Sequence, residues 1–259
     1  MARGFGVAGA LDRTIVRRLA EEAERLGYDA FWANDTPDGD GLAALAEAAA
    51  VTRGIRLGVG VIPLDRQPPG HIADRVRELN LPVDRLTLGV GSGGARQSLS
   101  LVRESIPELR SRTGAAVVVG ALGPKMCAVA GSVADGALLN WLTPDFAVLS
   151  TQLVRHAASE ADRPSPLIAA YVRTALGAPA SDRLRAEADR YASIPSYAAH
   201  FTRMGATAME TGVVAESPPE VQQGLAVFEA AVDQTVVRAV VGEERLDDYL
   251  ALLEAAAPR

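Results

Sequence analysis

Strand-like and helix-like segments alternate along the whole chain. The first cycle pairs a short strand at 4–9 with a helix at 13–27, in which apolar residues recur at helical spacing and Gly27 ends the helix. The other predicted strands lie at 28–35, 55–62, 85–91, 115–122, 136–142, 166–176 and 235–241. The other predicted helices lie at 41–54, 69–80, 95–111, 144–161, 181–193, 196–204, 217–232 and 243–257, with one more beginning at Pro124. Pro107 is expected to kink or interrupt its helix, because a proline inside a helix loses a hydrogen bond and clashes with the preceding turn.

Eight strand–helix cycles in 259 residues, without a linker or a low-complexity segment, predict a (β/α)8 barrel, also called a TIM barrel. The alternative is a doubly wound open sheet with a dinucleotide-binding loop. Gly89, Gly91 and Gly94 have the required G-x-G-x-x-G spacing, but they follow the fourth strand rather than the first. The next strand, which ends at Leu122, also lacks the acidic residue that would bind a ribose. We therefore expect one α/β barrel domain over residues 1–259.

Composition and charge narrow the classes of function. The net charge of −6 argues against nonspecific nucleic-acid binding, which needs clustered positive charge. No stretch of about 20 apolar residues could span a membrane, and the first residues become polar too early for a secretory signal. The single cysteine, Cys127, fits a reducing compartment. We expect a cytoplasmic protein that acts on a small molecule. No metal site is expected, because neither His156 nor His200 has a second ligand at suitable spacing.

The carboxyl ends of the strands are where a barrel places its active site, and four of the eight ends are dense in glycine. These ends lie at 6–9, 60–62, 91–94 and 120–123. Glycines there would form a flat rim against which a planar ring system can lie, with backbone N–H groups available to it. The alternative is that small residues only ease packing. Their place at strand ends, and not within strands, favours a cofactor site.

Four segments resemble the luciferase-like monooxygenase superfamily, the flavin- and deazaflavin-dependent barrel enzymes. They read LGYDAFWANDTP, GIRLGVGVIPLDRQPP, LPVDRLTLGVGSG and VVVGALGPKMCAVAGSVADGALLNWLTP. The likeness continues more loosely after about residue 145, for example in YVRTALG and VDQTVVRAVV. The last of the four segments is the most specific, and it is especially common in the branch that uses coenzyme F420, a deazaflavin.

The resemblance implies a cofactor site at these strand ends. The expected cofactor-binding residues are Gly60, Val61, Gly91, Ser92, Gly120, Ala121, Leu122, Gly123 and Lys125. The loop at 120–123 would bind the cofactor phosphate because it precedes a helix N-terminus, and Lys125 would add the only lysine ammonium group of the chain. Lys125 could equally be a solvated helix residue. The family also implies a cis peptide between Gly60 and Val61, which would form a bulge behind the ring.

Asp35, at the end of the second strand, is the expected catalytic residue. A carboxylate there could bind the cofactor or transfer a proton to a substrate carbonyl. The alternative is an Asx turn or a helix cap. Many relatives have histidine at the following position, where this chain has Thr36, so one candidate acid is missing. The expected substrate-binding residues are Asn140, Trp141, Tyr171 and Arg173.

Three functions are open at this point. The first is F420-dependent transfer of a hydride to or from a small organic substrate. The second is an FMN-dependent monooxygenase with a separate flavin reductase, which would need a lid that excludes water. The third is a barrel without catalysis that binds flavin or nothing.

The resemblance also bears on how the pocket is closed and on assembly. Family members usually have a long excursion after the fourth strand, and this chain lacks it. We therefore expect the pocket to be open, or to be closed by a partner subunit or by residues 190–216. Similar proteins imply a homodimer.

Overall fold

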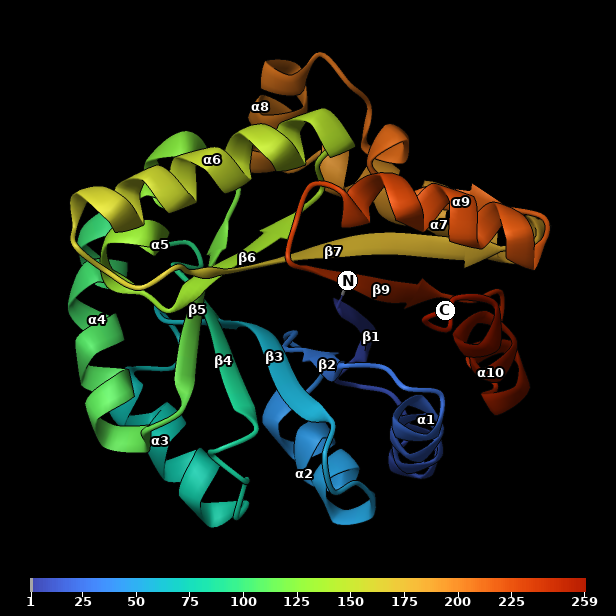
Figure 1. The fold of residues 1–259 in the computed structure, drawn as a ribbon, viewed down its shortest axis with the longest axis horizontal. Helices are drawn as coiled ribbons and strands as arrows, with labels where there is room; N and C mark the ends of the chain where they lie inside the picture. The colour runs from blue at the N-terminus through green and yellow to red at the C-terminus, as the bar shows by residue number, and fades with distance from the viewer. Residues whose placement is uncertain (1) are drawn as a thin grey trace.

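Eight parallel strands close into a barrel in the computed structural model, which describes residues 2–259 (Figure 1). The barrel strands are β1 (Ala2–Ala8), β2 (Ala30–Asn34), β3 (Arg56–Pro63), β4 (Leu86–Gly91), β5 (Ala116–Ala121), β6 (Gly136–Asn140), β7 (Leu167–Leu176) and β9 (Gln234–Val240). Strands β1 to β7 pair in chain order, and β9 lies between β7 and β1, where it closes the ring. The predicted TIM barrel is confirmed. That the whole chain is one domain stays a prediction.

Helices lie outside the ring of strands (Figure 1). They are α1 (Arg13–Arg25), α2 (Gly41–Val51), α3 (Pro69–Glu78), α4 (Ser98–Thr113), α5 (Pro124–Val133), α6 (Pro144–Glu160), α7 (Ala178–Ala192), α8 (Pro195–Met204), α9 (Pro218–Glu229) and α10 (Leu246–Ala255). Six of them have proline at the first or second position. An N–H group there would have no acceptor within the helix, so proline loses no hydrogen bond. No helix within residues 2–259 is long and apolar enough to cross a membrane.

The inside of the barrel has its own small core, separate from the large core between strands and helices. It consists of Ala30, Trp32, Val118, Leu138, Ala169, Tyr171 and Val236, with Val61 packed against it. Trp32 is 1% exposed, and its Nε1 donates a hydrogen bond of 2.9 Å to Gln234 Oε1. The indole fits because Gly58 faces it, where a Cβ would lie 2.3 Å from Trp32 Cδ2. A glycine on β3 therefore makes room for the largest side chain of the barrel interior.

Helix α4 differs from the prediction in its first residue and at Pro107. It begins at Ser98 rather than 95, because residues 92–97 form turns. An interruption at Pro107 was wrong, because α4 continues through this residue to Thr113. Pro107 is exposed, so the carbonyl that loses its helical N–H partner can be solvated.

The segment after β7 contains two short elements that were not predicted, in addition to the predicted α8. Residues 190–216 include α8, a short 3-10 helix η1 (Ala208–Thr211) and a three-residue strand β8 (Val213–Ala215). Strand β7 is long enough to pair with β6 through Tyr171 and then with β8 from Thr174 onward. Strand β8 therefore pairs with the end of β7, beyond the residues of β7 that pair with β6. A three-residue strand is too short to give a periodic pattern in the sequence.

Candidate active site

A cavity of about 350 Å³ opens at the carboxyl ends of the barrel strands. Its volume is within the range of small-molecule sites. The predicted site residues that line it are Asp35, Gly60, Val61, Gly91, Ser92, Gly120, Ala121, Leu122, Asn140 and Tyr171. Tyr191, at the end of α7, and Ser196 and Tyr197 of α8 complete the wall. The segment at 190–216 therefore contributes part of the cavity wall.

Glycines shape the floor of this cavity around Val61. A Cβ on Gly120 would lie 2.8 Å from Val61 Cγ1, and a Cβ on Gly60 would lie 2.3 Å from Leu138 Cδ2. The peptide between Gly60 and Val61 is cis, as expected, and the register of β3 against β4 shifts between Val59 and Ile62. The ends of β3 and β5 consequently present backbone, and not side chains, to the cavity.

Two polar atoms at the cavity are buried without a hydrogen-bond partner among residues 2–259. They are Asn34 Oδ1 and the hydroxyl oxygen of Tyr171. Burial raises the pKa of Tyr171, so its hydroxyl stays protonated and can donate. An unpaired buried polar group costs about 1–3 kcal/mol, a cost that a bound molecule with polar edges would remove. The glycine floor and these two atoms together fit a planar heterocycle.

Asp35 is the only carboxylate that lines the cavity among the described residues. Its Oδ1 accepts a hydrogen bond of 3.2 Å from the N–H of Gly41, the first residue of α2. Its Oδ2 accepts one of 3.1 Å from Gln67 Nε2. Burial raises the pKa of Asp35 above its ordinary value, and the hydrogen bond from Gly41 opposes this. The side chain of Asp35 therefore bonds to the start of α2, as a helix cap would, and also lines the cavity, as a catalytic carboxylate would.

The family model for luciferase-like monooxygenases matches residues 4–114, which include the first four barrel strands. Residues 4–114 are thus similar in sequence to the luciferase-like monooxygenases. A curated relative, 4-hydroxyprotoasukamycin monooxygenase from Streptomyces nodosus subsp. asukaensis, is 34% identical over 102 residues. This match covers 37% of the chain and only 28% of the relative. The family model thus supports a likeness to these enzymes over the N-terminal part of the barrel.

Solved structures extend the likeness to the whole luciferase-like barrel. The F420-dependent tetrahydromethanopterin reductase from Methanopyrus kandleri superimposes with a TM-score of 0.73 at 17% identity, over 96% of this chain and 97% of that one. An F420-dependent secondary alcohol dehydrogenase, solved with an F420–acetone adduct, gives 0.76 at 14% identity over 99% of both chains. The oxygenating constituent of 3,6-diketocamphane monooxygenase from Pseudomonas putida, solved with FMN, gives 0.69 at 15% identity, over 99% of this chain and 96% of that one. At such low identities the matches establish the fold.

The expected phosphate loop of this luciferase-like barrel has an unforeseen neighbour. Gly123 is the N-cap of α5, and Lys125 is exposed on the first turn of that helix, so neither residue lines the cavity. Arg203 of α8 lies beside the loop, and its Nη2 donates a hydrogen bond of 3.2 Å to the carbonyl of Leu122. A Cβ on Gly123 would lie 3.5 Å from the same nitrogen. Since 81 positions separate Arg203 from Leu122, no local pattern indicated the guanidinium there.

His200 holds α8 against two of the loops at the carboxyl face. Its Nδ1 lies 2.9 Å from Arg203 Nη2, and its Nε2 lies 2.8 Å from the carbonyl oxygen of Trp141. A guanidinium can only donate, so Nδ1 accepts, and Nε2 carries the proton that it donates to Trp141. Burial lowers the pKa of His200, and this favours the neutral ring that the two contacts require. The histidine and Arg203 thus fix the ends of β5 and β6 relative to each other.

Trp141 and Arg173, both expected to bind substrate, do not line this cavity. Trp141 is 1% exposed, and its ring lies 4.7 Å from that of Tyr191. The guanidinium of Arg173 lies 3.5 Å above the Trp141 ring and pairs with Glu187 at 2.8 Å. It also donates a hydrogen bond of 2.6 Å to Asn140 Oδ1. Arg173 consequently orients Asn140, which does line the cavity, while Trp141 supports Arg173 from behind.

Proposed function

We propose that this chain is an oxidoreductase that transfers a hydride between coenzyme F420 and a small organic substrate. The cavity carries the proposal, because it brings together a glycine floor, the two unpartnered polar atoms of Asn34 and Tyr171, and the loop at 120–123. A deazaflavin ring bound there would supply the hydride donor or acceptor. The sequence likeness of residues 117–144 to the F420-dependent branch favours this cofactor.

The residues of the chain would divide the remaining work. Gly60 and Gly120 would let the ring approach the backbone, and Tyr171 would donate a hydrogen bond to its edge. The loop at 120–123 would bind the phosphate with its free N–H groups, assisted by Arg203. Asp35 would hold or deliver the proton that accompanies hydride transfer at a substrate carbonyl.

An FMN-dependent monooxygenase is the second candidate, and two observations favour it. The curated relative with 34% identity is named a monooxygenase. Ser196 and Tyr197 of α8 also cover the cavity, so the exclusion of water does not depend on an excursion after β4. Such an enzyme would need reduced flavin from a separate reductase.

Titration of the purified protein with coenzyme F420 and, separately, with FMN tests this choice through the fluorescence of each cofactor. We expect saturable binding of F420 that is at least about tenfold tighter than binding of FMN, a difference of about 1.4 kcal/mol. Tighter binding of FMN would contradict the proposal in favour of the monooxygenase. Binding of neither would leave the non-catalytic barrel.

Arg203→Gln is expected to weaken F420 binding by about tenfold, because it removes a cation beside the phosphate loop. The matched control uses the ligand: the phosphate-free deazaflavin nucleoside should bind the variant and the parent protein equally well. If the variant weakens both ligands to the same extent, Arg203 only supports α8 and the phosphate lies elsewhere.

Gly123→Asp should weaken F420 binding in the same sense, because its carboxylate would face the phosphate and also pair with Arg203. Its matched control is Gly123→Asn, which adds nearly the same volume without the charge. The backbone of Gly123 is extended, with φ −128° and ψ 164°, so either side chain fits without strain. Equal affinities for Gly123→Asp and Gly123→Asn would place the phosphate away from this loop.

A further inference from the structure

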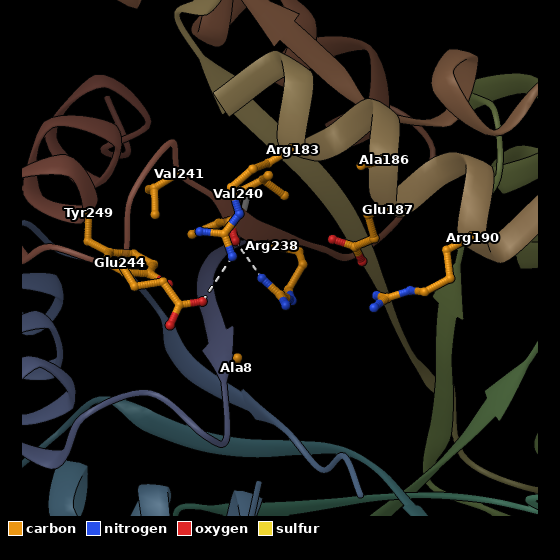
Figure 2. A pocket seen from close by; sticks show the side chains of 11 residues that line it. Ala8, Arg183, Ala186, Glu187, Arg190, Arg238, Val240, Val241, Glu244 and Tyr249 are labelled. Atoms are coloured by element: carbon orange, nitrogen blue, oxygen red, sulfur yellow. Dashed lines mark hydrogen bonds and ion pairs between the residues drawn. The ribbon is translucent and has the colours of Figure 1, made fainter. Parts of the chain in front are cut away.

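A second cavity has a volume of about 250 Å³, and Figure 2 shows the residues that line it. It lies at the ends of β1 and β9, between side chains of α7 on one side and side chains of residues 241–249 on the other. Its charged lining residues are Arg183, Glu187, Arg190, Arg238 and Glu244, and we call it the arginine cavity. None of these residues lines the cavity proposed to bind the cofactor.

The charges of the arginine cavity do not balance. Arg183 pairs with Glu244 at 3.0 Å, and Glu187 pairs with Arg173 at 2.8 Å, so both acids already have a partner. No ion pair to Arg190 or Arg238 occurs within the described part of the chain, residues 2–259. Two guanidinium groups are therefore left over, in a protein whose net charge is −6. An excess of fixed positive charge in a concave site favours an anionic ligand.

Arg238 shows the imbalance most directly. It lies on β9 beside Arg173 of β7, and of these two neighbouring guanidinium groups only that of Arg173 forms an ion pair with Glu187. Although burial opposes it, the positive charge of Arg173 and Arg238 lowers the pKa of Glu187 and keeps it ionised. The Nε of Arg238 is buried without a partner, and Nη1 donates only to the carbonyl of the adjacent Ala239. A buried, unpaired guanidinium donor costs free energy that an anion would recover.

The side chains are arranged so that a small anion could contact several of them. Figure 2 shows Arg238, Glu187 and Arg190 around one open space, with Arg238 coming from β9 and the other two from α7. Guanidinium groups bind carboxylates and phosphates through paired hydrogen bonds. The buried Arg173 contacts one lining residue of each cavity, because it donates hydrogen bonds both to Glu187 and, at 2.6 Å, to Asn140 Oδ1.

We propose that the arginine cavity binds the anionic group of the substrate, a carboxylate or a phosphate ester, through Arg238 and Arg190. The assignment of this anion to the substrate rests on the proposed function, whereas the anion site itself does not.

Isothermal titration of the purified protein, without cofactor, tests the anion site. The probes are inorganic phosphate and succinate, with succinamide as the uncharged analogue of succinate. We expect one saturable site per chain for at least one anion and none for succinamide. Arg190→Gln and Arg238→Gln should each weaken anion binding by about tenfold or more. Arg185→Gln, which removes an exposed arginine of α7 outside the cavity, should leave binding unchanged.

The outcomes separate this proposal from the proposed function. Tighter binding of phosphate would identify a phosphate ester, and tighter binding of succinate would identify a carboxylate. Absence of saturable binding, or equal binding in the parent protein and in Arg190→Gln, would overturn the site. Arg190 is exposed, so this variant is informative even if Arg238→Gln fails to fold. If the anions bind but neither F420 nor FMN does, the site stands and the proposed function fails.

Discussion

Asp35→Asn is expected to lower turnover by about 100-fold or more while the barrel stays folded. Asp35 is the only carboxylate lining the cavity among residues 2–259, so no neighbouring acid can replace it there. Asparagine keeps the shape of the side chain and still offers an oxygen to the N–H of Gly41, which preserves the start of α2. Asp38→Asn is the matched control, because Asp38 is exposed in the same loop and does not line the cavity.

The dependence of kcat/KM on pH distinguishes proton transfer from a merely structural role of Asp35. Because burial raises the pKa of Asp35, the limb that it controls should lie at higher pH than an ordinary aspartate would place it, and Asp35→Asn should lose this limb. This is the acid limb when Asp35 accepts the proton and the basic limb when it donates the proton. Gln67→Leu removes a hydrogen bond that favours the carboxylate, so it should move the limb to higher pH. A limb unchanged in both variants would remove Asp35 from the mechanism.

The same variant should change stability in the opposite direction from activity. A raised pKa in the folded state means that folding disfavours the ionised carboxylate of Asp35. The penalty is complete above the folded-state pKa and disappears as pH falls below the unfolded-state value of about 3.9. Asp35→Asn should therefore unfold at a higher urea concentration than the parent protein at neutral pH, with the difference shrinking on acidification. If Asp35 served stability alone, Asp35→Asn would instead unfold at a lower urea concentration than the parent protein.

The fold was predictable because each barrel unit carries its own signal. A buried parallel strand such as β5 is nearly all apolar, and Gly27 and Pro124 mark the end and the start of helices by local chemistry. The site floor was predictable for the same reason, since the glycines at 60 and 120 lie at strand ends. Local patterns therefore located the strands, the helices and the backbone that surrounds the cavity.

Contacts between distant segments were not predictable in this way. Arg203 reaches Leu122 because α8 packs against Trp141 through Phe201, and no periodic pattern specifies that contact. Trp141 was expected in the substrate pocket because it ends a strand. Its backbone instead has a left-handed φ of 53°, and the ring lies beneath Arg173. A bulky residue rarely adopts this conformation, and nothing in the sequence around it indicates the turn.

Arg173 of β7 and Arg238 of β9 are charged residues in apolar strands, a feature that the sequence alone can identify. A charged residue in an apolar strand is costly unless it is paired or binds an anion, and the sequence has two such residues, Arg173 and Arg238. The structure gives Arg173 a partner in Glu187 and leaves Arg238 without one among the described residues. The sequence could not distinguish them, because Glu187 lies on a helix whose rotation about its axis is set by packing.

Gly58→Ala is expected to lower the free energy of unfolding by about 2–3 kcal/mol, at the upper end of the cost of overpacking a core. The new methyl carbon would lie 2.3 Å from Trp32 Cδ2, which is ring carbon and not the end of a flexible side chain. The indole cannot shift freely, because its Nε1 donates a hydrogen bond to Gln234 of β9, two strands away from β2 in the barrel. The midpoint of urea denaturation measures the change. Gly70→Ala is the control, because a Cβ there would have nothing within 4 Å and alanine favours α3.

A double variant tests whether the clash with Trp32 is the cause. Trp32→Phe shortens the ring and leaves Gln234 without its donor, so alone it should also destabilise the barrel. If Gly58→Ala acts through the indole, Gly58→Ala combined with Trp32→Phe should cost less than the sum of the two single variants. Additive costs would show that Gly58 is needed for its backbone and not for the space that it leaves. In that case the backbone of β3 at Gly58, and not the space for the Trp32 indole, would determine the packing inside the barrel.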